Sequence, residues 1–153
     1  MMNTTDTVVI ERRINARPEV VFSFFTTRDR WLQWKGIDGT IEAAPGGTFR
    51  VKVTGDDTIA AGTFFVVDPH SRIVFSWGWE GEGQPVPPGS SIVEVTFEPD
   101  GDQTLLRLTH RDLPPDARAP HSAGWNHYLD RLAIRAADGD PGPDEWITAT
   151  DSA

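Results

Sequence analysis

Apolar and polar residues alternate through most of the central part of the chain, and this pattern predicts antiparallel strands. The alternation is most regular over 91–98, where Val93, Val95 and Phe97 share one face and polar residues occupy the other. Segments rich in glycine and proline, such as the loop at 80–89, separate the alternating runs. Strands are expected at 7–14, 40–43, 48–54, 58–67, 72–80, 91–98 and 104–111.

Two other parts of the chain show helical spacing. After the first strand, residues 16–27 place Pro18 in the first turn, where a helix tolerates it, and 29–34 predicts a second short turn. A long helix is expected near the C-terminus, because large apolar residues there recur with a helical period. That stripe consists of Trp125, Leu129, Leu132 and Ala136, with Tyr128 beside it. His121 lies one turn before the stripe begins.

The order of these elements predicts an α+β fold. A curved antiparallel sheet of about six strands is wrapped around a long C-terminal helix, with two short helices after the first strand. A sheet curled around one helix does not fill its wide end, so we expect a cavity between helix and sheet. Residues 1–136 are expected to form one domain. The segment 137–153 has no periodicity and many breakers, which predicts a mobile tail.

Composition narrows the class of protein. The chain has 153 residues, 38% of them hydrophobic and 24% charged, which is typical of a globular domain. No apolar run is long enough to cross a bilayer, and no secretory signal is recognisable, so we expect a cytoplasmic protein. The net charge of −9 and the lack of a Lys/Arg cluster argue against nucleic acid as a partner. The absence of cysteine excludes disulfides and cysteine–zinc sites.

Six sequence features, in a fixed order, resemble a known superfamily. They are ARPEVVF (16–22), the pair Trp31 and Trp34, PGGTFRV (45–51), VDPHSRIVFSWGW (67–79), VEVTFEPDGDQTLLRLTH (93–110) and HSAGWNHYLDRL (121–132). Together they resemble the START-like, or SRPBCC, superfamily of helix-grip proteins. The similarity is closest to the branch related to the C-terminal domain of the activator of heat-shock protein ninety ATPase. The resemblance implies a START-like ligand-binding domain, but the superfamily also contains cyclases, hydrolases and lipid carriers.

Aromatic side chains and histidines are the candidate binding groups. Indole rings at a cavity mouth offer flat apolar contact and an N–H donor, which suits a small aromatic ligand. The candidate ligand-binding residues are Trp34, Phe49, Phe65, Trp77, Trp79, His110, His121, Trp125 and Leu129. Gly124 costs helix stability, on the order of 1 kcal/mol, and therefore indicates close packing or a need for space.

His110 and His121 titrate near neutral pH, so either can act as an acid, a base or a hydrogen-bond partner in a cavity. For His110 we favour a structural role at its strand end, whereas for His121 both interpretations stay open. The four histidines lie at no recognised metal-ligand spacing. We therefore expect no metal site and no cofactor, and we assign no catalytic residue.

The principal hypothesis is a small-molecule binding protein that holds a hydrophobic or aromatic ligand between helix and sheet. The first alternative is a cyclase- or hydrolase-type enzyme that uses the same cavity and a histidine paired with a buried acid. No such pair is recognisable in the sequence, so enzymatic activity is not favoured. The second alternative, a chaperone-regulating interaction module, is suggested only by the resemblance. We expect no nucleic acid and no membrane as partner, and a homodimer stays open.

Overall fold

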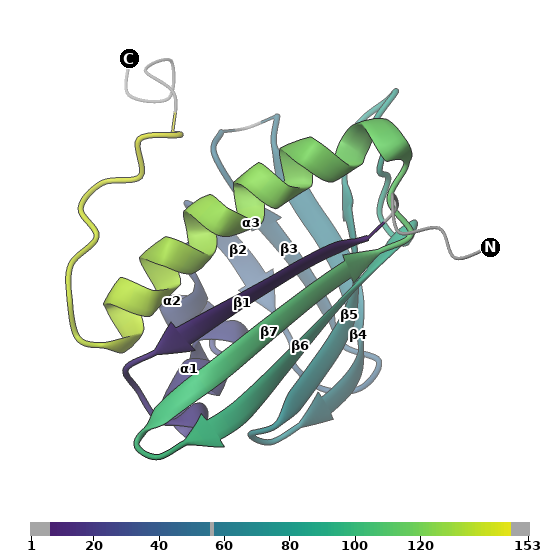
Figure 1. Cartoon of the computed structure of the whole chain (residues 1–153). Coiled ribbons are helices and arrows are strands. Elements are labelled where there is room, and N and C mark those ends of the chain that lie inside the picture. The colour runs from purple at the N-terminus through teal and green to yellow at the C-terminus, as the bar shows by residue number, and fades with distance from the viewer. Residues whose placement is uncertain (1–6, 56, 148–153) are drawn as a thin grey trace.

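The computed structural model describes residues 7–55 and 57–147, which form a curved antiparallel sheet and three helices (Figure 1). The strands are β1 (Val8–Ile14), β2 (Asp38–Ile41), β3 (Thr48–Lys52), β4 (Ile59–Asp68), β5 (Arg72–Trp79), β6 (Ser91–Asp100) and β7 (Gln103–Arg111). The helices are α1 (Pro18–Thr26), α2 (Arg28–Trp31) and α3 (Pro115–Ala136). The strand order is β1-β7-β6-β5-β4-β3-β2. The predicted fold class is confirmed. Each of the seven ranges expected to be extended contributes a strand, including the short edge strand β2, so the sheet has seven strands rather than about six.

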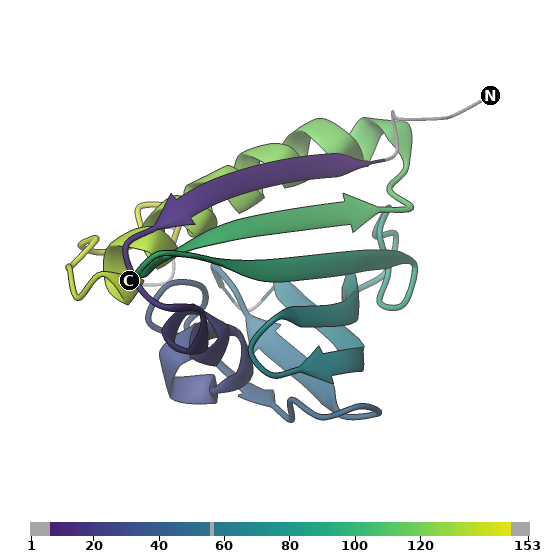
Figure 2. The ribbon, with the colours of Figure 1, turned by 60° about the horizontal axis from the view of Figure 1, so that its bottom comes forward.

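Helix α3 lies against the concave side of the sheet, whose strands curl around it (Figure 2). The apolar stripe predicted for this helix is buried, and Leu129 and Leu132 have no exposed surface. Strand alternation supplies the opposite side of the core. Val93, Val95 and Phe97 of β6 are buried, whereas the residues between them are only partly covered. This arrangement is the helix-grip fold. None of the helices in the described chain is long and apolar enough to cross a membrane.

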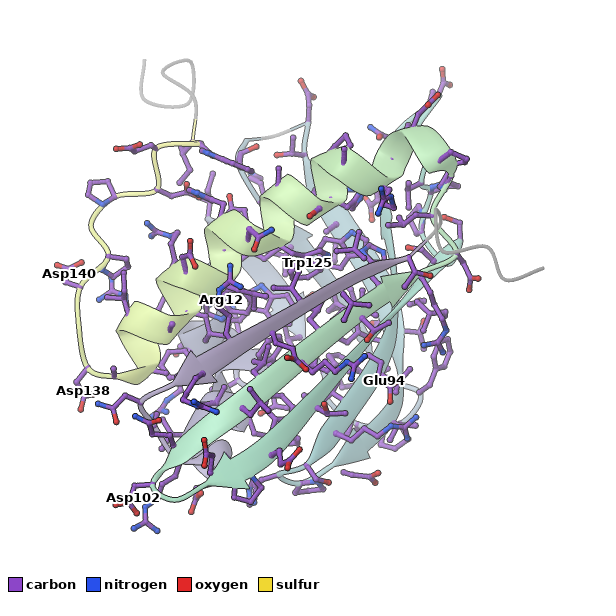
Figure 3. The ribbon with its side chains drawn as sticks, in the orientation of Figure 1. Arg12, Glu94, Asp102, Trp125, Asp138 and Asp140 are labelled. Atoms are coloured by element: carbon purple, nitrogen blue, oxygen red, sulfur yellow. The ribbon has the colours of Figure 1, made fainter. Side chains whose placement is uncertain are left out.

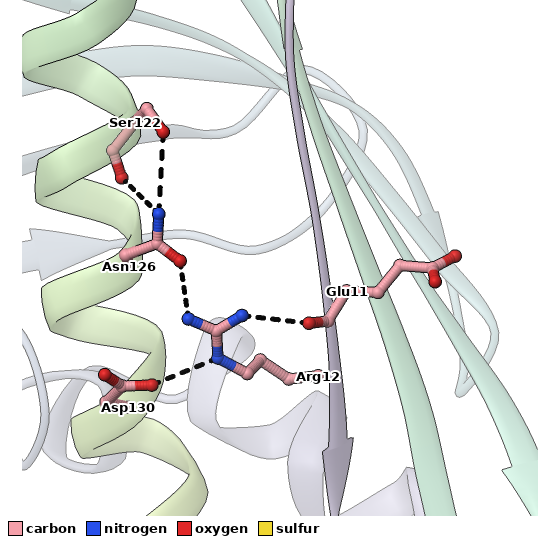
Figure 4. Close-up of polar contacts among 5 residues, drawn as sticks. All are labelled: Glu11, Arg12, Ser122, Asn126 and Asp130. Atoms are coloured by element: carbon pink, nitrogen blue, oxygen red, sulfur yellow. Dashed lines mark hydrogen bonds and ion pairs between the residues drawn. The ribbon is translucent and has the colours of Figure 1, made fainter.

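A polar contact holds β1 beside α3 (Figure 4). The Arg12 guanidinium donates hydrogen bonds to Asp130 Oδ1, at 3.0 Å, and to Asn126 Oδ1 of the helix. It also donates to the backbone carbonyl of Glu11, at 2.9 Å. Because the Asp130 side chain is 67% exposed, this ion pair contributes little stability, about 0–1 kcal/mol. Its geometry nevertheless sets where the middle of α3 lies on the first strand.

Helices α1 and α2 close one end of the space between α3 and the sheet. Phe25 of α1 is fully buried, and its ring centroid lies 6.0 Å from that of Trp31, 5.1 Å from Trp34 and 5.5 Å from Phe97. Trp34 Nε1 donates to the backbone carbonyl of Phe24 at 2.9 Å, so this buried indole is satisfied. Edge-to-face and tilted aromatic contacts fill this end of the domain.

The segment that follows α3 contacts the helix. We expected 137–153 to form a tail without regular structure, and its described part, 137–147, turns back along α3 (Figure 1). Asp144 accepts hydrogen bonds from the side chains of His127 and Tyr128, at 2.8 and 2.6 Å. A segment rich in breakers forms no helix or strand, but it can still make specific side-chain contacts. Residues 148–153 lie outside the described part of the chain.

Candidate functional site

A pocket of about 300 Å³ lies between the N-terminal half of α3 and the sheet, at the end opposite α1 and α2. Figure 3 shows Trp125 between α3 and the strands, where it forms part of the pocket wall. The lining residues are Lys35, Val53, Thr54, Thr58, Trp77, Trp79, Pro120, His121, Gly124, Trp125, Tyr128 and Trp146. Four tryptophans and a tyrosine make the wall mainly aromatic. Trp125 is only 2% exposed and its ring centroid lies 5.0 Å from that of Trp77.

His110 holds Trp125 in place from behind the pocket wall. Trp125 Nε1 donates to His110 Nδ1 at 2.9 Å, and His110 Nε2 lies 2.8 Å from Ser91 Oγ. An indole N–H can only donate, so Nδ1 must accept and the ring proton resides on Nε2, which donates to Ser91. Ser91 Oγ in turn donates to the Trp77 carbonyl at 2.7 Å. Burial, with smaller contributions from the neighbouring His121 and Lys35, lowers the pKa of His110 to about 3.

His121 makes the corresponding contact with the second indole. Trp79 Nε1 donates to His121 Nε2 at 3.0 Å, so Nδ1 carries the proton and donates to the Ala117 carbonyl at 2.8 Å. Burial lowers the pKa of His121 although the bond to Ala117 opposes the shift. Both histidines are thus neutral, and both ring nitrogens of each are occupied.

The occupied nitrogens limit the chemistry of the site. A general base needs a free lone pair within reach of the substrate, and protonating either ring would set two N–H donors against each other. Among the described residues, no carboxylate is hydrogen-bonded to His110 or His121, and this is the pairing on which the enzyme alternative depends. The His–carboxylate pair that the structure does contain, His127 with Asp144, positions the tail.

Lys35 is the charged group of the pocket, and sequence reasoning missed it. The residue is 4% exposed, and its Nζ lies 3.9 Å from the ring centroid of Tyr128, 4.9 Å from Trp125 and 5.3 Å from Trp77. Within the described chain it makes no hydrogen bond or ion pair. Burial lowers its pKa to about 7, against the opposing attraction of Asp144. The direct contacts of the ammonium in the described chain are therefore with aromatic faces, in cation–π geometry.

The tail supplies the last part of the wall. The Trp146 ring stacks on His127, with centroids 4.0 Å apart and planes 2° from parallel. Asp144 fixes this arrangement, because it accepts from His127, from the Tyr128 hydroxyl and from the backbone N–H of Trp146. Burial works to raise the pKa of Asp144, but these hydrogen bonds outweigh it and the pKa is lowered. Asp144 is thus an engaged carboxylate that holds a pocket wall in place.

A more polar hollow of about 510 Å³ lies on the other side of Lys35, between 32–36 and the tail. Lys35 also borders this hollow, and the two arginines in its lining bond to backbone carbonyls. Arg131 donates to the carbonyls of Trp34 and Gly142, at 3.2 and 3.0 Å, and Arg135 donates to that of Gln33 at 3.1 Å. These bonds join α3 to its neighbours, so we take the aromatic pocket as the candidate site.

The structure places the nine predicted ligand-binding residues in three groups. Trp77, Trp79, His121 and Trp125 line the pocket, and His110 lies directly behind it. Trp34, Phe49 and Leu129 are buried in the core outside the pocket lining. Phe65 points away from the core and is 50% exposed, which corrects its assignment. Its neighbour Phe64 takes the inward position of β4, just before a register shift between Phe64 and Val66.

The residues that sequence reasoning missed had weak signals or none. Tyr128 lies beside the predicted apolar stripe, and its position on the flank of the helix was a weak signal for the pocket lining. Lys35 sits in an irregular turn and Trp146 in a segment rich in breakers, where no periodicity assigns a direction to a side chain. Only the return of the tail along α3 brings Trp146 to the pocket.

A curved sheet gripping one long helix, with an aromatic pocket between them, defines a helix-grip protein of the START-like class. The family described as Activator of Hsp90 ATPase homolog 1-like protein matches residues 15–137, and the chain belongs to this family. No curated protein matches the chain.

Solved structures agree with this assignment. An AHSA1-like protein from Rhizobium etli is 43% identical, with a TM-score of 0.69, over 91% of this chain and 88% of that one. DynU16, from the dynemicin biosynthetic locus, is 25% identical with a TM-score of 0.77, over 92% of this chain and 50% of its own. An HSP90 activator from Plasmodium falciparum is 21% identical with a TM-score of 0.67, over 84% of this chain and 94% of that one. This last likeness shows the fold alone.

Proposed function

We propose that this protein binds a small aromatic or hydrophobic molecule in the pocket between α3 and the sheet. The observation that carries the proposal is an aromatic-walled pocket of about 300 Å³ in which the indoles with an open side are fixed by hydrogen bonds. A pocket of this size and lining suits a ligand of two or three fused rings, which would gain stacking and apolar burial.

The hydrogen bonds of the wall support binding over catalysis. Trp79 and Trp125 donate to histidines, and the Tyr128 hydroxyl donates to Asp144, so the walls present ring faces. Because these side chains are already ordered before the ligand binds, little conformational entropy is lost on binding. The enzyme alternative was expected to use a histidine paired with a buried acid, and both candidate histidines are already engaged with indoles.

The chaperone alternative gains no support from the described surface. A co-chaperone would be expected to show a large contiguous apolar patch. The large exposed hydrophobic residues of the described chain are Val9, Ile37, Phe65, Ile134 and Trp146, which lie on five different elements or segments. The likeness to the Plasmodium falciparum activator concerns the fold and carries no contact surface with it.

The test uses a variant that fills the pocket without disturbing the core. A Cβ added at Gly124 would meet only one atom, Trp146 Cζ3 at 4.0 Å, so Gly124→Leu should place its side chain in the pocket. Ala123→Leu adds the same side chain one residue earlier, at an exposed position, and is the matched control. Both proteins should fold like the natural chain.

The measurement is a titration with neutral bicyclic and tricyclic aromatics, with 2-naphthamide as reference probe, followed by the indole N–H resonances of Trp79 and Trp125. We expect these resonances to shift, and affinity to fall by about tenfold or more in Gly124→Leu but not in Ala123→Leu. If no compound binds, or if the two leucine variants bind equally well, the proposal is wrong.

A further inference from the structure

Lys35 points to the chemistry of the ligand. We propose that the pocket takes an aromatic acid, whose rings lie between the tryptophans and whose carboxylate pairs with Lys35 Nζ. This inference rests on the proposed function and specifies the ligand class. Its basis is an unpartnered ammonium group, on a residue only 4% exposed, that borders an apolar pocket.

The other polar groups of the pocket side chains are largely paired within the protein. Trp79 and Trp125 donate to His121 and His110, and the Tyr128 hydroxyl donates to Asp144. The hydroxyls of Thr54 and Thr58 lie 2.9 Å apart and bond to each other. Trp77 Nε1 is the exception, a buried donor without a partner in the described chain. Lys35 Nζ is therefore the charged group left for a ligand to satisfy.

No carboxylate of the described residues forms an ion pair with Lys35 Nζ. None of the described residues that line the pocket is Asp or Glu. Asp144 attracts Lys35, but its oxygens already accept from Tyr128, His127 and the Trp146 backbone. Aromatic faces stabilise a buried cation only in part, because cation–π attraction is weak compared with the loss of hydration. A carboxylate brought by a ligand would supply the missing counter-charge and a charge-assisted hydrogen bond.

A competing explanation is that Lys35 has a structural role only. In that case its contacts with the rings of Trp77, Trp125 and Tyr128 are all that it needs. The two explanations differ in what an acid gains over its neutral analogue. If Lys35 is a ligand partner, a carboxylate gains an ion pair in the pocket and an amide of the same shape does not. If the role is structural, the pocket treats the two alike or rejects the anion, because the net charge of the chain is −9.

The experiment compares 2-naphthoate with 2-naphthamide, which have the same ring system, on the natural protein and on Lys35→Met. Methionine keeps an unbranched apolar side chain and removes the charge, and Lys35→Gln is a second variant that keeps a polar end. We expect the natural protein at pH 6.5 to bind the acid about tenfold more tightly than the amide. In both variants that preference should disappear, so that the acid and the amide bind with affinities within about threefold of each other.

Proton uptake gives a readout that a structural role would not produce. The groups facing Lys35 are Asp144 from the tail, Tyr128 and His121 from α3, and His110 from β7. At pH 8 the free amine is mainly neutral, so a bound carboxylate, by raising the pKa of Lys35, should draw a proton from solution. Calorimetry in two buffers of different ionisation enthalpy measures this uptake, which we expect to approach one proton and to be absent in Lys35→Met.

The outcomes separate this inference from the proposed function. If the amide binds as tightly as the acid, or if Lys35→Met keeps the preference, Lys35 is not the partner of an acid. Amide binding that Gly124→Leu abolishes would then still support an aromatic pocket. If neither compound binds the natural protein, and the wider aromatic panel also fails, both proposals are wrong.

Discussion

The two ends of the space between α3 and the sheet are both aromatic, but one is filled and the other is hollow. At the filled end, Phe25 and Trp31 lie within a continuous set of ring contacts and have no exposed surface. At the hollow end, Trp77, Trp79 and Trp125 border about 300 Å³ of space. Aromatic composition therefore does not distinguish core from pocket. The difference arises because α1 and α2 fold into one end, whereas only the start of α3 and the tail reach the other.

The indole N–H groups at the two ends have different partners. At the filled end, Trp34 donates to a backbone carbonyl, whereas at the hollow end Trp79 and Trp125 each donate to a histidine. Each end also contains one indole whose Nε1 has no partner in the described chain, Trp31 at the filled end and Trp77 at the hollow end. A ring without packing on one face can be held in one orientation by a directional bond. The two histidines therefore orient two of the indoles that border the pocket.

The largest effect is expected at the filled end. Phe25→Ala removes a fully buried ring from contact with Trp31, Trp34 and Phe97. We expect the free energy of unfolding to fall by about 3–5 kcal/mol, with affinity for 2-naphthamide unchanged where the variant is folded. Urea melts and probe titrations measure the two quantities. A loss of affinity comparable to the loss of stability would mean that the ends are not independent.

Trp125→Ala applies the same truncation at the hollow end. Because one side of this indole already faces a void, fewer contacts are lost, and water entering the enlarged pocket can reach His110. The cost should lie below about 3 kcal/mol, while probe affinity should fall clearly. Paired urea melts and titrations test this. A stability loss equal to that of Phe25→Ala with unaltered binding would show that Trp125 is ordinary core.

Lys35→Met should stabilise the fold, on the order of 2 kcal/mol at pH 6, because it removes a buried cation that has no ion-pair partner in the described chain. The folded-state pKa of Lys35, about 7, lies below its ordinary value of 10.5. Below pH 7 both folded and unfolded chains carry the proton, and the folded state bears the full cost of the buried charge. As the pH rises from 7 to 10.5, only the unfolded chain keeps the Lys35 proton, so the free energy of unfolding of the natural protein increases. The difference in stability between the natural protein and Lys35→Met therefore narrows. Urea melts across this range would contradict the assignment if the difference stayed constant.

Acid should weaken the hollow end through His110. Its folded-state pKa, about 3, lies below the ordinary value of 6.5, so below pH 6.5 only the unfolded chain binds this proton. The free energy of unfolding should therefore fall as the pH drops from 6.5 toward 3, by about 1 kcal/mol between pH 6.5 and 5.5. His110→Gln should be less stable at pH 7 but lose less on acidification. If the free energy of unfolding fell equally steeply with pH in the natural protein and in His110→Gln, His110 would not be the cause of the acid sensitivity.

The smallest effect concerns Gly124. Its added Cβ would have open space, so Gly124→Ala should stabilise the helix by about 0.5–1 kcal/mol. Gly62 of β4 is the contrasting position, because a Cβ there would lie 1.9 Å from the Ser76 carbonyl oxygen. Gly62→Ala should be clearly destabilising in the same thermal melts. If Gly124→Ala were destabilising as well, the space around this helix would be smaller than the structure shows.

Much of the fold followed from periodicity. Alternation located six of the seven strands closely, and β2 was placed only two residues away, at 40–43 rather than Asp38–Ile41. The apolar stripe correctly predicted which face of α3 is buried, because apolar residues with a period of 3.6 lie on one side of a helix and that side packs against the sheet. The site was predicted less completely. Trp77, Trp79, His121 and Trp125 share inward positions on regular elements, and these line the pocket.

By itself, the amino-acid sequence determined the class of fold, the face that each regular element buries and the end at which a cavity forms. Tertiary structure alone decided which inward residues border space and which are covered. Leu129 and Trp125 share one stripe, but α1 and α2 close over one end of it only. It also decided the positions of Lys35 and Trp146, which lie in segments without periodicity. Their places depend on contacts with distant parts of the chain, and such contacts leave no regular pattern along a sequence.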